Sequence, residues 1–210
     1  MSVYDFAPDT VVQTVDQLQT LYGEASERAL VKELDHVSEH YRALIEASGF
    51  VVLASVGPEG VDVSPRGDPP GFVKVVSPRC LMLPDRRGNN RADTLKNIVR
   101  DPRVSLLFMI PGVGTTLRVI GLARVVVDEQ LCGRFMMQNK PARSVLVIDV
   151  QSVYFQCQKA LVRSGLWDVE RFVDPASLPS AGEMLQHLDA QFDGKAYDAS
   201  YKDYMRETIY

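Results

Sequence analysis

Basic and amide side chains are concentrated in one short stretch, where an apolar run ends and a helical pattern begins. The stretch is Pro84-Asp85-Arg86-Arg87-Gly88-Asn89-Asn90-Arg91, between the apolar Leu81-Met82-Leu83 and the helix-like Ala92–Val99. The first turn of a helix has unpaired backbone N–H groups and the positive end of the helix dipole, and arginine and asparagine side chains add further donors. These residue types in this order predict a site for an anion such as a phosphate group. A solvated arginine-rich turn without a ligand is the alternative.

A second basic segment lies about twenty residues earlier in the chain. Its first part, Val61–Ser64, alternates apolar and polar residues as a β-strand does, and a Pro/Gly-rich loop with another arginine and aspartate follows. The whole segment reads Val61-Asp62-Val63-Ser64-Pro65-Arg66-Gly67-Asp68-Pro69-Pro70-Gly71-Phe72. We expect two neighbouring strands that end with their basic loops side by side.

The two segments carry a family resemblance. The motifs "SPRGDPPGF" and "PDRRGNNR", preceded by "ASGFVVLAS" and followed far downstream by "RSGLW", resemble the FMN-binding split-barrel family related to pyridoxamine 5′-phosphate oxidase. The resemblance runs from about Ile45 to Trp167, and it implies a cofactor, FMN, that lies at a dimer interface. The cofactor-binding residues that it implies are Ser64, Pro65, Arg66, Gly67, Asp68, Pro84, Asp85, Arg86, Arg87, Asn89, Asn90, Arg91, Arg163 and Trp167. The basic and aromatic residues that would bind pyridoxamine phosphate are not found, so the substrate is left open.

Within this set, Arg66 and Arg91 are the best suppliers of a fixed bidentate geometry for a dianionic phosphate. Both are expected to lie in loops. One phosphate site without a second glycine-rich loop for an AMP half favours FMN over FAD. The sequence contains no GxGxxG or GxxxxGK[ST] motif, and Gly112 and Gly114 lie between two expected strands, which predicts a hairpin turn rather than a nucleotide loop.

The composition is ordinary for a soluble globular protein, with 46% hydrophobic and 24% charged residues among 210. We predict one domain over residues 1–210, with a helical N-terminal part (1–48), a barrel (49–167) and a C-terminal extension (168–210). The net charge of −4 argues against nucleic acid or an anionic membrane as a partner. The N-terminus lacks a basic region followed by an apolar core, and no run of 18 apolar residues exists, so a cytoplasmic protein is expected.

The cysteines and histidines do not form a convincing metal or disulfide pattern. Cys80, Cys132 and Cys157 are odd in number and lack a short paired spacing, which favours free thiols. His36 and His40 are four residues apart in a segment predicted to be helical, a spacing that can bind a metal, but no third ligand is indicated. We therefore predict an exposed helix face there and no metal site.

Apolar periodicity predicts the fold class. Residues 14–48 have helical spacing, and β-rich runs follow them, including a central strand at Val104–Ile110 that is expected to be buried on both faces. Ser144–Val150 continues into Val153–Cys157 across an expected bulge at Gln151-Ser152. Many antiparallel hairpins with one embedded helix and no βαβ alternation predict a mainly β (α+β) fold, a six- to seven-stranded antiparallel split β-barrel with flanking helices.

Two more helical segments are predicted towards the C-terminus. Residues 129–139 have an apolar side, and residues 181–191 form a short helical pattern. Beyond them, Tyr197, Tyr201 and Tyr204 are spaced to share one helical face that docks on the body or on a partner chain, and a partly frayed terminus is the alternative.

Three functions are left open. The first is an FMN-dependent oxidoreductase acting on a small-molecule substrate, with NAD(P)H as a candidate electron donor. The second is a flavin-binding or sensing protein without turnover, favoured because no Cys/His or Tyr/His catalytic constellation is evident. The third is a degenerate split barrel that serves as an interaction module. A homodimer with two equivalent FMN sites is expected, because the strands Val104–Ile110 and Ser144–Val150 carry more hydrophobic surface than one small barrel can bury. The Arg163–Trp167 segment is the candidate element that closes the cleft of the partner chain.

Overall fold

The computed structural model describes residues 6–210, and the chain divides into two compact units, Met1–Glu33 and Leu34–Tyr210. The described part of the first unit holds η1 (Pro8–Thr10), α1 (Val15–Tyr22) and α2 (Glu27–Leu30). Thr14 begins α1 with a capping box, in which its hydroxyl accepts from the Gln17 N–H and the Gln17 side chain accepts from the Thr14 N–H. Neither α-helix of this unit buries a residue within the described chain.

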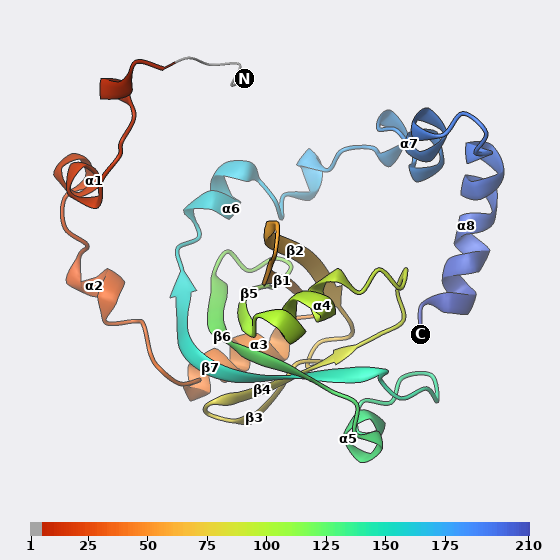
Figure 1. Ribbon diagram of the computed structural model, residues 1–210, viewed down its shortest axis with the longest axis horizontal. Helices are drawn as coiled ribbons and strands as arrows, with labels where there is room; N and C mark the ends of the chain where they lie inside the picture. The colour runs from red at the N-terminus through yellow and green to blue at the C-terminus, as the bar shows by residue number, and fades with distance from the viewer. Residues whose placement is uncertain (1–5) are drawn as a thin grey trace. The chain divides into compact units, whose positions relative to one another are not determined.

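The second unit is built on one antiparallel sheet of seven strands, which curls into a split barrel (Figure 1). The strands are β1 (Phe50–Gly57), β2 (Gly60–Gly67), β3 (Lys74–Ser77), β4 (Cys80–Asp85), β5 (Arg103–Met109), β6 (Thr116–Val126) and β7 (Ser144–Gln156). Their order is β2-β1-β5-β6-β7-β4-β3, so β2 and β3 are the two edges, and no ladder joins these edges within residues 6–210. The mainly β split barrel predicted from the sequence is thus confirmed.

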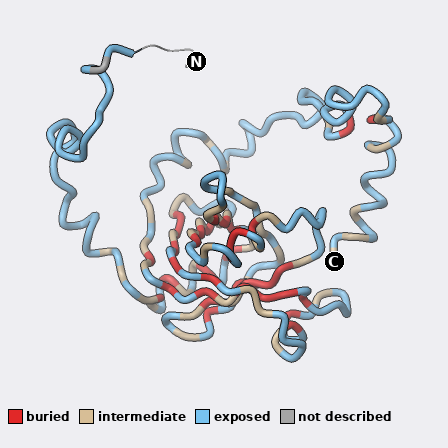
Figure 2. Tube along the Cα trace, viewed as in Figure 1, coloured by how far each residue is buried: buried red, intermediate tan, exposed pale blue. Residues whose placement is uncertain are grey.

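Alternation along the strands fills the barrel. Leu53 of β1, Leu106 of β5 and Val119 of β6 are fully buried and lie opposite one another in register, and Figure 2 shows buried residues gathered on the strands. Burial of such side chains is worth about 1.5–3 kcal/mol each relative to exposure. The β5 strand, however, is buried on one face only, because Leu107 and Met109 are half-buried; the prediction of a strand buried on both faces was wrong for this chain by itself.

Two helices, α3 and α4, pack against strands of the barrel. The helix α3 (Glu39–Ala47) begins at Ser38, whose hydroxyl accepts from the Tyr41 N–H, and it buries Tyr41 and Ile45. The helix α4 (Asp93–Arg100) is held to β1 by a hydrogen bond from Asn97 Nδ2 to Ser55 Oγ, 3.2 Å long.

The predicted helix over residues 14–48 is interrupted, and this corrects the sequence-based expectation. Leu34 forms an antiparallel bridge with Val153 of β7, through backbone hydrogen bonds in both directions. These contacts hold the chain extended before α3, so His36 lies outside the helix that contains His40. The histidines therefore do not share a helix face, and His36 pairs with Asp35 instead.

The predicted helix over residues 129–139 is also shorter than expected. The helix α5 (Glu129–Gly133) ends well before residue 139. Gln138 and Asn139 adopt positive φ angles in a tight turn closed by the Met137–Lys140 bridge, a conformation that a helix through residue 139 would not allow. The bulge predicted in β7 is confirmed, since the register with β6 shifts by one residue between Val150 and Ser152. None of the helices in residues 6–210 is both long enough and apolar enough to cross a membrane.

The chain after β7 is mostly helical. Its elements are α6 (Lys159–Ser164), η2 (Val169–Arg171), η3 (Pro175–Ser177), α7 (Ala181–Leu188) and α8 (Gly194–Thr208). The helices α7 and α8 meet at Gly182 and Gly194, where a Cβ on Gly182 would lie 2.1 Å from the Gly194 carbonyl oxygen, so no larger residue fits. Tyr197, Tyr201 and Tyr204 share one face of α8, as their spacing predicted, and neighbouring rings make tilted contacts with centroids 5.5 and 6.3 Å apart.

Candidate functional site

The motif that begins at Ser64 lies on an edge strand and not in a loop. Pro65, Arg66 and Gly67 pair with Val52, Val51 and Phe50 of β1, so β2 continues three residues beyond the expected end. A proline is tolerated because β2 has a neighbour on one side only. Since Arg66 is opposite the fully buried Val51, the two side chains share the inner face of the sheet. The prediction that Arg66 lies in a loop was wrong.

Two reciprocal ion pairs join the two basic segments across the split. Arg66 Nη1 of β2 pairs with Asp85 at the end of β4, and Arg86 Nε pairs with Asp68 Oδ2 at 2.8 Å. The strands β2 and β4 are not neighbours in the sheet, so side chains and not backbone hydrogen bonds hold these ends together. The two basic segments lie together as expected. The expectation that their strands are neighbours in the sheet was wrong, because ion pairs between side chains bring them together instead.

Arg86 serves as a clamp between the strands and the loop after α5. Besides its pair with Asp68, its Nη1 donates to the Phe135 carbonyl oxygen over 2.5 Å, and its guanidinium lies 5.7 Å from the centroid of the Tyr210 ring. The side chain of Asp68 is 1% exposed and also accepts from the Tyr210 hydroxyl over 2.6 Å. This hydrogen bond is the main reason that the pKa of Tyr210 is raised, so the phenol stays protonated and donates.

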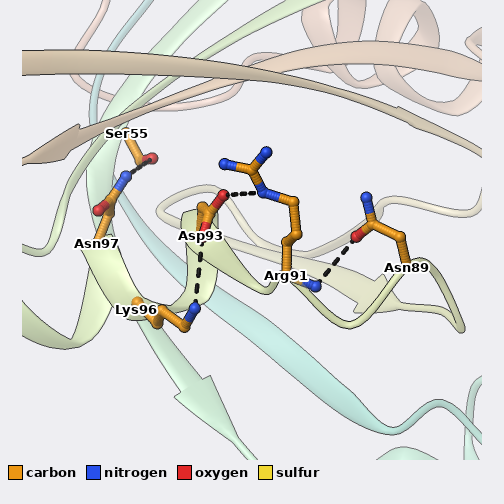
Figure 3. A network of polar contacts seen from close by, with 6 residues as sticks. All are labelled: Ser55, Asn89, Arg91, Asp93, Lys96 and Asn97. Carbon is orange, nitrogen blue, oxygen red and sulfur yellow. Dashed lines mark hydrogen bonds and ion pairs between the residues drawn. The ribbon is translucent and has the colours of Figure 1, made fainter. Parts of the chain in front are cut away.

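The N-terminus of α4 is open to an anion. Its N-cap residue, Ala92, has a left-handed backbone with φ 55°, as Asn90 does with φ 61°, and no described side chain caps the helix. The first N–H groups of the helix are therefore left for another acceptor. Asn89 shapes this turn by accepting from the Arg91 N–H over 3.1 Å (Figure 3).

Asp93, the first residue of α4, places a negative charge at the same helix end. Figure 3 shows it between two cations, with Arg91 Nε at 2.8 Å and Lys96 Nζ at 3.4 Å. The hydrogen bond from Arg91 is the largest cause of a lowered pKa for Asp93. Arg91 itself is 77% exposed and is bound to this carboxylate, so it does not point a free guanidinium into the site.

A cleft of about 1170 Å³ lies in the split and brings the predicted residues together. It is lined by all of the predicted cofactor-binding residues on the two segments, namely Ser64, Pro65, Arg66, Gly67, Asp68, Pro84, Asp85, Arg86, Arg87, Asn89, Asn90 and Arg91. Arg163 and Trp167 do not line it; the Trp167 indole donates to the Val113 carbonyl oxygen over 3.0 Å instead. A volume of this size accommodates a cofactor-sized ligand.

The residues that line this cleft and were not predicted from the sequence include Thr94, Arg143, Ser144 and Tyr210. Ser144 is the first residue of β7 and pairs in register with Asp85, while Arg143 Nη1 donates to Asn90 Oδ1 over 3.0 Å. Arg143 could have been predicted from its place in the sequence, because it is a basic residue directly before the apolar run of β7. The far C-terminal position of Tyr210 gave no such signal.

Unpartnered polar groups in the cleft indicate a ligand. Arg66 Nε and Ser144 Oγ are buried, and neither has a hydrogen-bond partner within the described chain. A buried polar atom without a partner costs about 1–3 kcal/mol, so a bound acceptor that reached both atoms would recover that free energy. Arg87 has no ion-pair partner among residues 6–210, and it provides a cation that is available to an anionic ligand.

A smaller recess of about 230 Å³ adjoins the cleft and is cationic. It is lined by Arg86, Arg87, Lys140, Pro141, Arg143 and Tyr210. Of its four basic side chains, Arg86 is paired with Asp68 and Lys140 donates to the Tyr210 backbone oxygen. The described residues contain no cluster of three or more potential metal ligands. The cleft and recess together are thus suited to bind a phosphate or another compact anion attached to a larger group.

A comparison with protein families matches the segment of the chain that contains the barrel strands. Residues 37–157 match the family described as pyridoxamine 5′-phosphate oxidase. This segment contains the sheet, α4 and both basic segments, and it covers more than half of the chain.

Solved structures with a related fold are distant in sequence. An FMN-binding protein from Syntrophomonas wolfei is 13% identical, with a TM-score of 0.44, and the match covers 67% of this chain and 95% of that one. General Stress Protein 26 from Bacillus anthracis is 18% identical, with a TM-score of 0.42, over 54% of this chain and 88% of that one. HupZ from Group A Streptococcus is 10% identical, with a TM-score of 0.47, and the match covers 58% of this chain and 94% of that one. No curated protein matches the sequence.

Proposed function

The chain belongs to the pyridoxamine 5′-phosphate oxidase family, and from this premise we propose that it is an FMN-dependent oxidoreductase acting on a small organic substrate. The observation that carries the proposal is the uncapped N-terminus of α4, which faces a cofactor-sized cleft that holds orphaned donors and an unpaired arginine. FMN, when bound, supplies the redox chemistry, and the protein positions it.

In this proposal the residues of the cleft have three roles. The first turn of α4 receives the phosphate together with Asn90, Arg87 and Arg143, because helix N–H groups and an arginine fork match its oxygens. Arg66 Nε and Ser144 Oγ donate to polar atoms elsewhere on the ligand. Arg86, together with its partner Asp68, holds the wall of the cleft and does not bind the phosphate directly. A single anion-binding helix end favours FMN over a dinucleotide.

A flavin-binding protein without turnover is the second candidate. The residues that line the cleft include no histidine and no cysteine, so an acid–base or nucleophilic side chain of these types is not supplied by the described part of this chain. The ionisable residues Asp68 and Asp85 are both committed to ion pairs. A site of this kind binds and protects a flavin even when no substrate reacts there.

We also propose a homodimer, supported by an apolar face on the outside of the sheet. Phe50 is 38% exposed, Val63 is 59% exposed and Ile120 is 38% exposed, and the half-buried Leu107 and Met109 lie on the same face by register. Arg118 and Ser105 lie among these apolar residues on the same face. Exposed apolar residues gathered on one sheet face are commonly buried against a symmetric copy. The strand β2, which contains Val63, also borders the cleft, so the partner would lie beside the ligand. The Arg163–Trp167 segment of the partner chain is the proposed closing element.

The colour of the purified protein tests the proposed function. We expect a yellow protein that releases FMN, and not FAD, on denaturation. Anaerobic mixing with NADH or NADPH should bleach the flavin, and air should restore it, if an NAD(P)H-dependent oxidoreductase is correct. A bound flavin that neither nicotinamide nor a panel of small organic donors reduces would favour the binding protein without turnover. A colourless protein that takes up no added FMN at micromolar concentration would overturn both candidates.

A further inference from the structure

The two residues that follow α8, Ile209 and Tyr210, form one wall of the candidate site. Both line the cleft in the split, and Tyr210 also lines the cationic recess. They come from a part of the chain that is separated from the barrel strands by five helical elements. The site is therefore built from the barrel and from the C-terminal segment together.

Three contacts hold Tyr210 in this position. Its hydroxyl donates to Asp68 Oδ1 over 2.6 Å, its ring lies against the Arg86 guanidinium, and its backbone oxygen accepts from Lys140 Nζ over 2.6 Å. The three partners follow β2, β4 and α5, so one residue is tied to three separate parts of the barrel. A hydrogen bond to a charged carboxylate alone shifts an equilibrium by about 10- to 150-fold.

The helix before these residues has few other contacts to hold it. The helix α8 packs mainly against α7 and buries Gly194, and its tyrosine rings contact one another at tilted angles. Lys202 and Arg206 are exposed along it. The contacts of Tyr210 are thus the principal attachment between the end of α8 and the barrel.

We propose that docking of Tyr210 completes the ligand site, so that occupancy of the cleft and docking of the C-terminal segment stabilise each other. The inference rests on the proposed function, because it takes FMN as the ligand. Ile209 and Tyr210 line the cleft only while the C-terminal segment is docked on the barrel, so they contact FMN only in that state. By linkage, the ligand then favours docking by the same factor by which docking favours the ligand.

The test is the variant Tyr210→Phe, which removes the hydroxyl and keeps the ring. Tyr204→Phe is the matched control, because Tyr204 lies on α8 a few residues before Tyr210, is 53% exposed and does not line the cleft. Without FMN, trypsin should cleave Tyr210→Phe after Lys202 and Arg206 about tenfold faster than the wild type, in line with the loss of one charge-assisted hydrogen bond. The control should be cleaved at the wild-type rate. Lys140→Ala removes a second contact and should shift cleavage in the same direction.

The second measurement is FMN binding by the same proteins. FMN should slow cleavage of the wild type, and Tyr210→Phe should bind FMN about three- to tenfold more weakly, with the control unchanged. Equal cleavage of Tyr210→Phe and wild type without FMN would overturn the docking. Faster cleavage together with unchanged FMN affinity would overturn the coupling alone. A wild-type protein that binds no FMN would overturn the proposed function and the coupling with it, while the cleavage rates measured without FMN still decide whether Tyr210 docks.

Discussion

Replacing Arg66 by alanine is expected to destabilise the barrel itself, in addition to any loss of ligand binding. Arg66 lies on the edge strand β2 and pairs with Asp85 across the split, and the two side chains are only 19% and 12% exposed. The substitution leaves a nearly buried carboxylate without its counter-charge. Loss of one partner from a fully buried pair costs roughly 3–5 kcal/mol, and the remaining exposure of this pair lowers the expected loss to about 2–4 kcal/mol.

Urea unfolding of the FMN-free protein, at one protein concentration for all variants, measures this loss. A double-mutant cycle with Asp85→Asn isolates the pair: the double variant no longer buries an unpaired charge, and it should be more stable than Arg66→Ala by about 1–3 kcal/mol. Arg103→Ala is the matched control, because Arg103 pairs with Asp101 and is 68% exposed, so its loss should leave the urea midpoint nearly unchanged. A change below about 0.5 kcal/mol in Arg66→Ala would refute the idea that this pair holds the split together.

Three further predictions follow from the site and its surroundings. Arg87→Ala and Arg143→Ala should each weaken FMN binding by about 1.5–3 kcal/mol without changing the urea midpoint, as judged by flavin fluorescence titration. Asp101 has its pKa lowered to about 2 by hydrogen bonds from the Arg103 side chain and backbone, so the stabilisation from this pair is present above the ordinary pKa near 3.8 and is lost as the pH falls towards 2. A carboxyl ¹³C titration should show that the pKa of Asp101 rises in the Arg103→Ala variant but stays below 3.8, because the backbone N–H of residue 103 still donates to it. Ile120→Glu should convert the proposed dimer into a monomer in sedimentation velocity, and a variant that stays dimeric would show that this sheet face is not the interface.

The barrel was predictable because its signals are local. Alternation along Phe50–Val56 and the hairpin at Gly57–Gly60 determine strand and turn without reference to distant residues, and the observed register agrees. The end of the predicted N-terminal helix could not be placed, because the backbone bridge of Leu34 to Val153 stabilises an extended chain that the helical spacing of the sequence does not reveal. Tertiary contacts of this kind override local propensity.

The candidate site was predictable in composition but not in geometry. The two basic segments were correctly placed together, yet the sequence gives no indication that Arg66 and Arg86 are neutralised by Asp85 and Asp68, since each pair joins residues about eighteen positions apart. Ser144 enters the site through its register opposite β4, and Tyr210 through the path of a long C-terminal segment. Neither register nor path is encoded in a short motif, which is why both residues were missed.

The most direct test of the central claim compares the affinity of the protein for FMN with its affinity for riboflavin. The two ligands share the ring system and the ribityl chain and differ in the phosphate alone, which the uncapped end of α4 and Arg87 are proposed to bind. We expect a dissociation constant for FMN in the micromolar range or below, and binding of riboflavin that is weaker by at least about tenfold, since several charge-assisted hydrogen bonds are lost. Equal affinity for the two ligands, or no binding of FMN, would contradict a phosphate-binding flavin site in the split of the barrel.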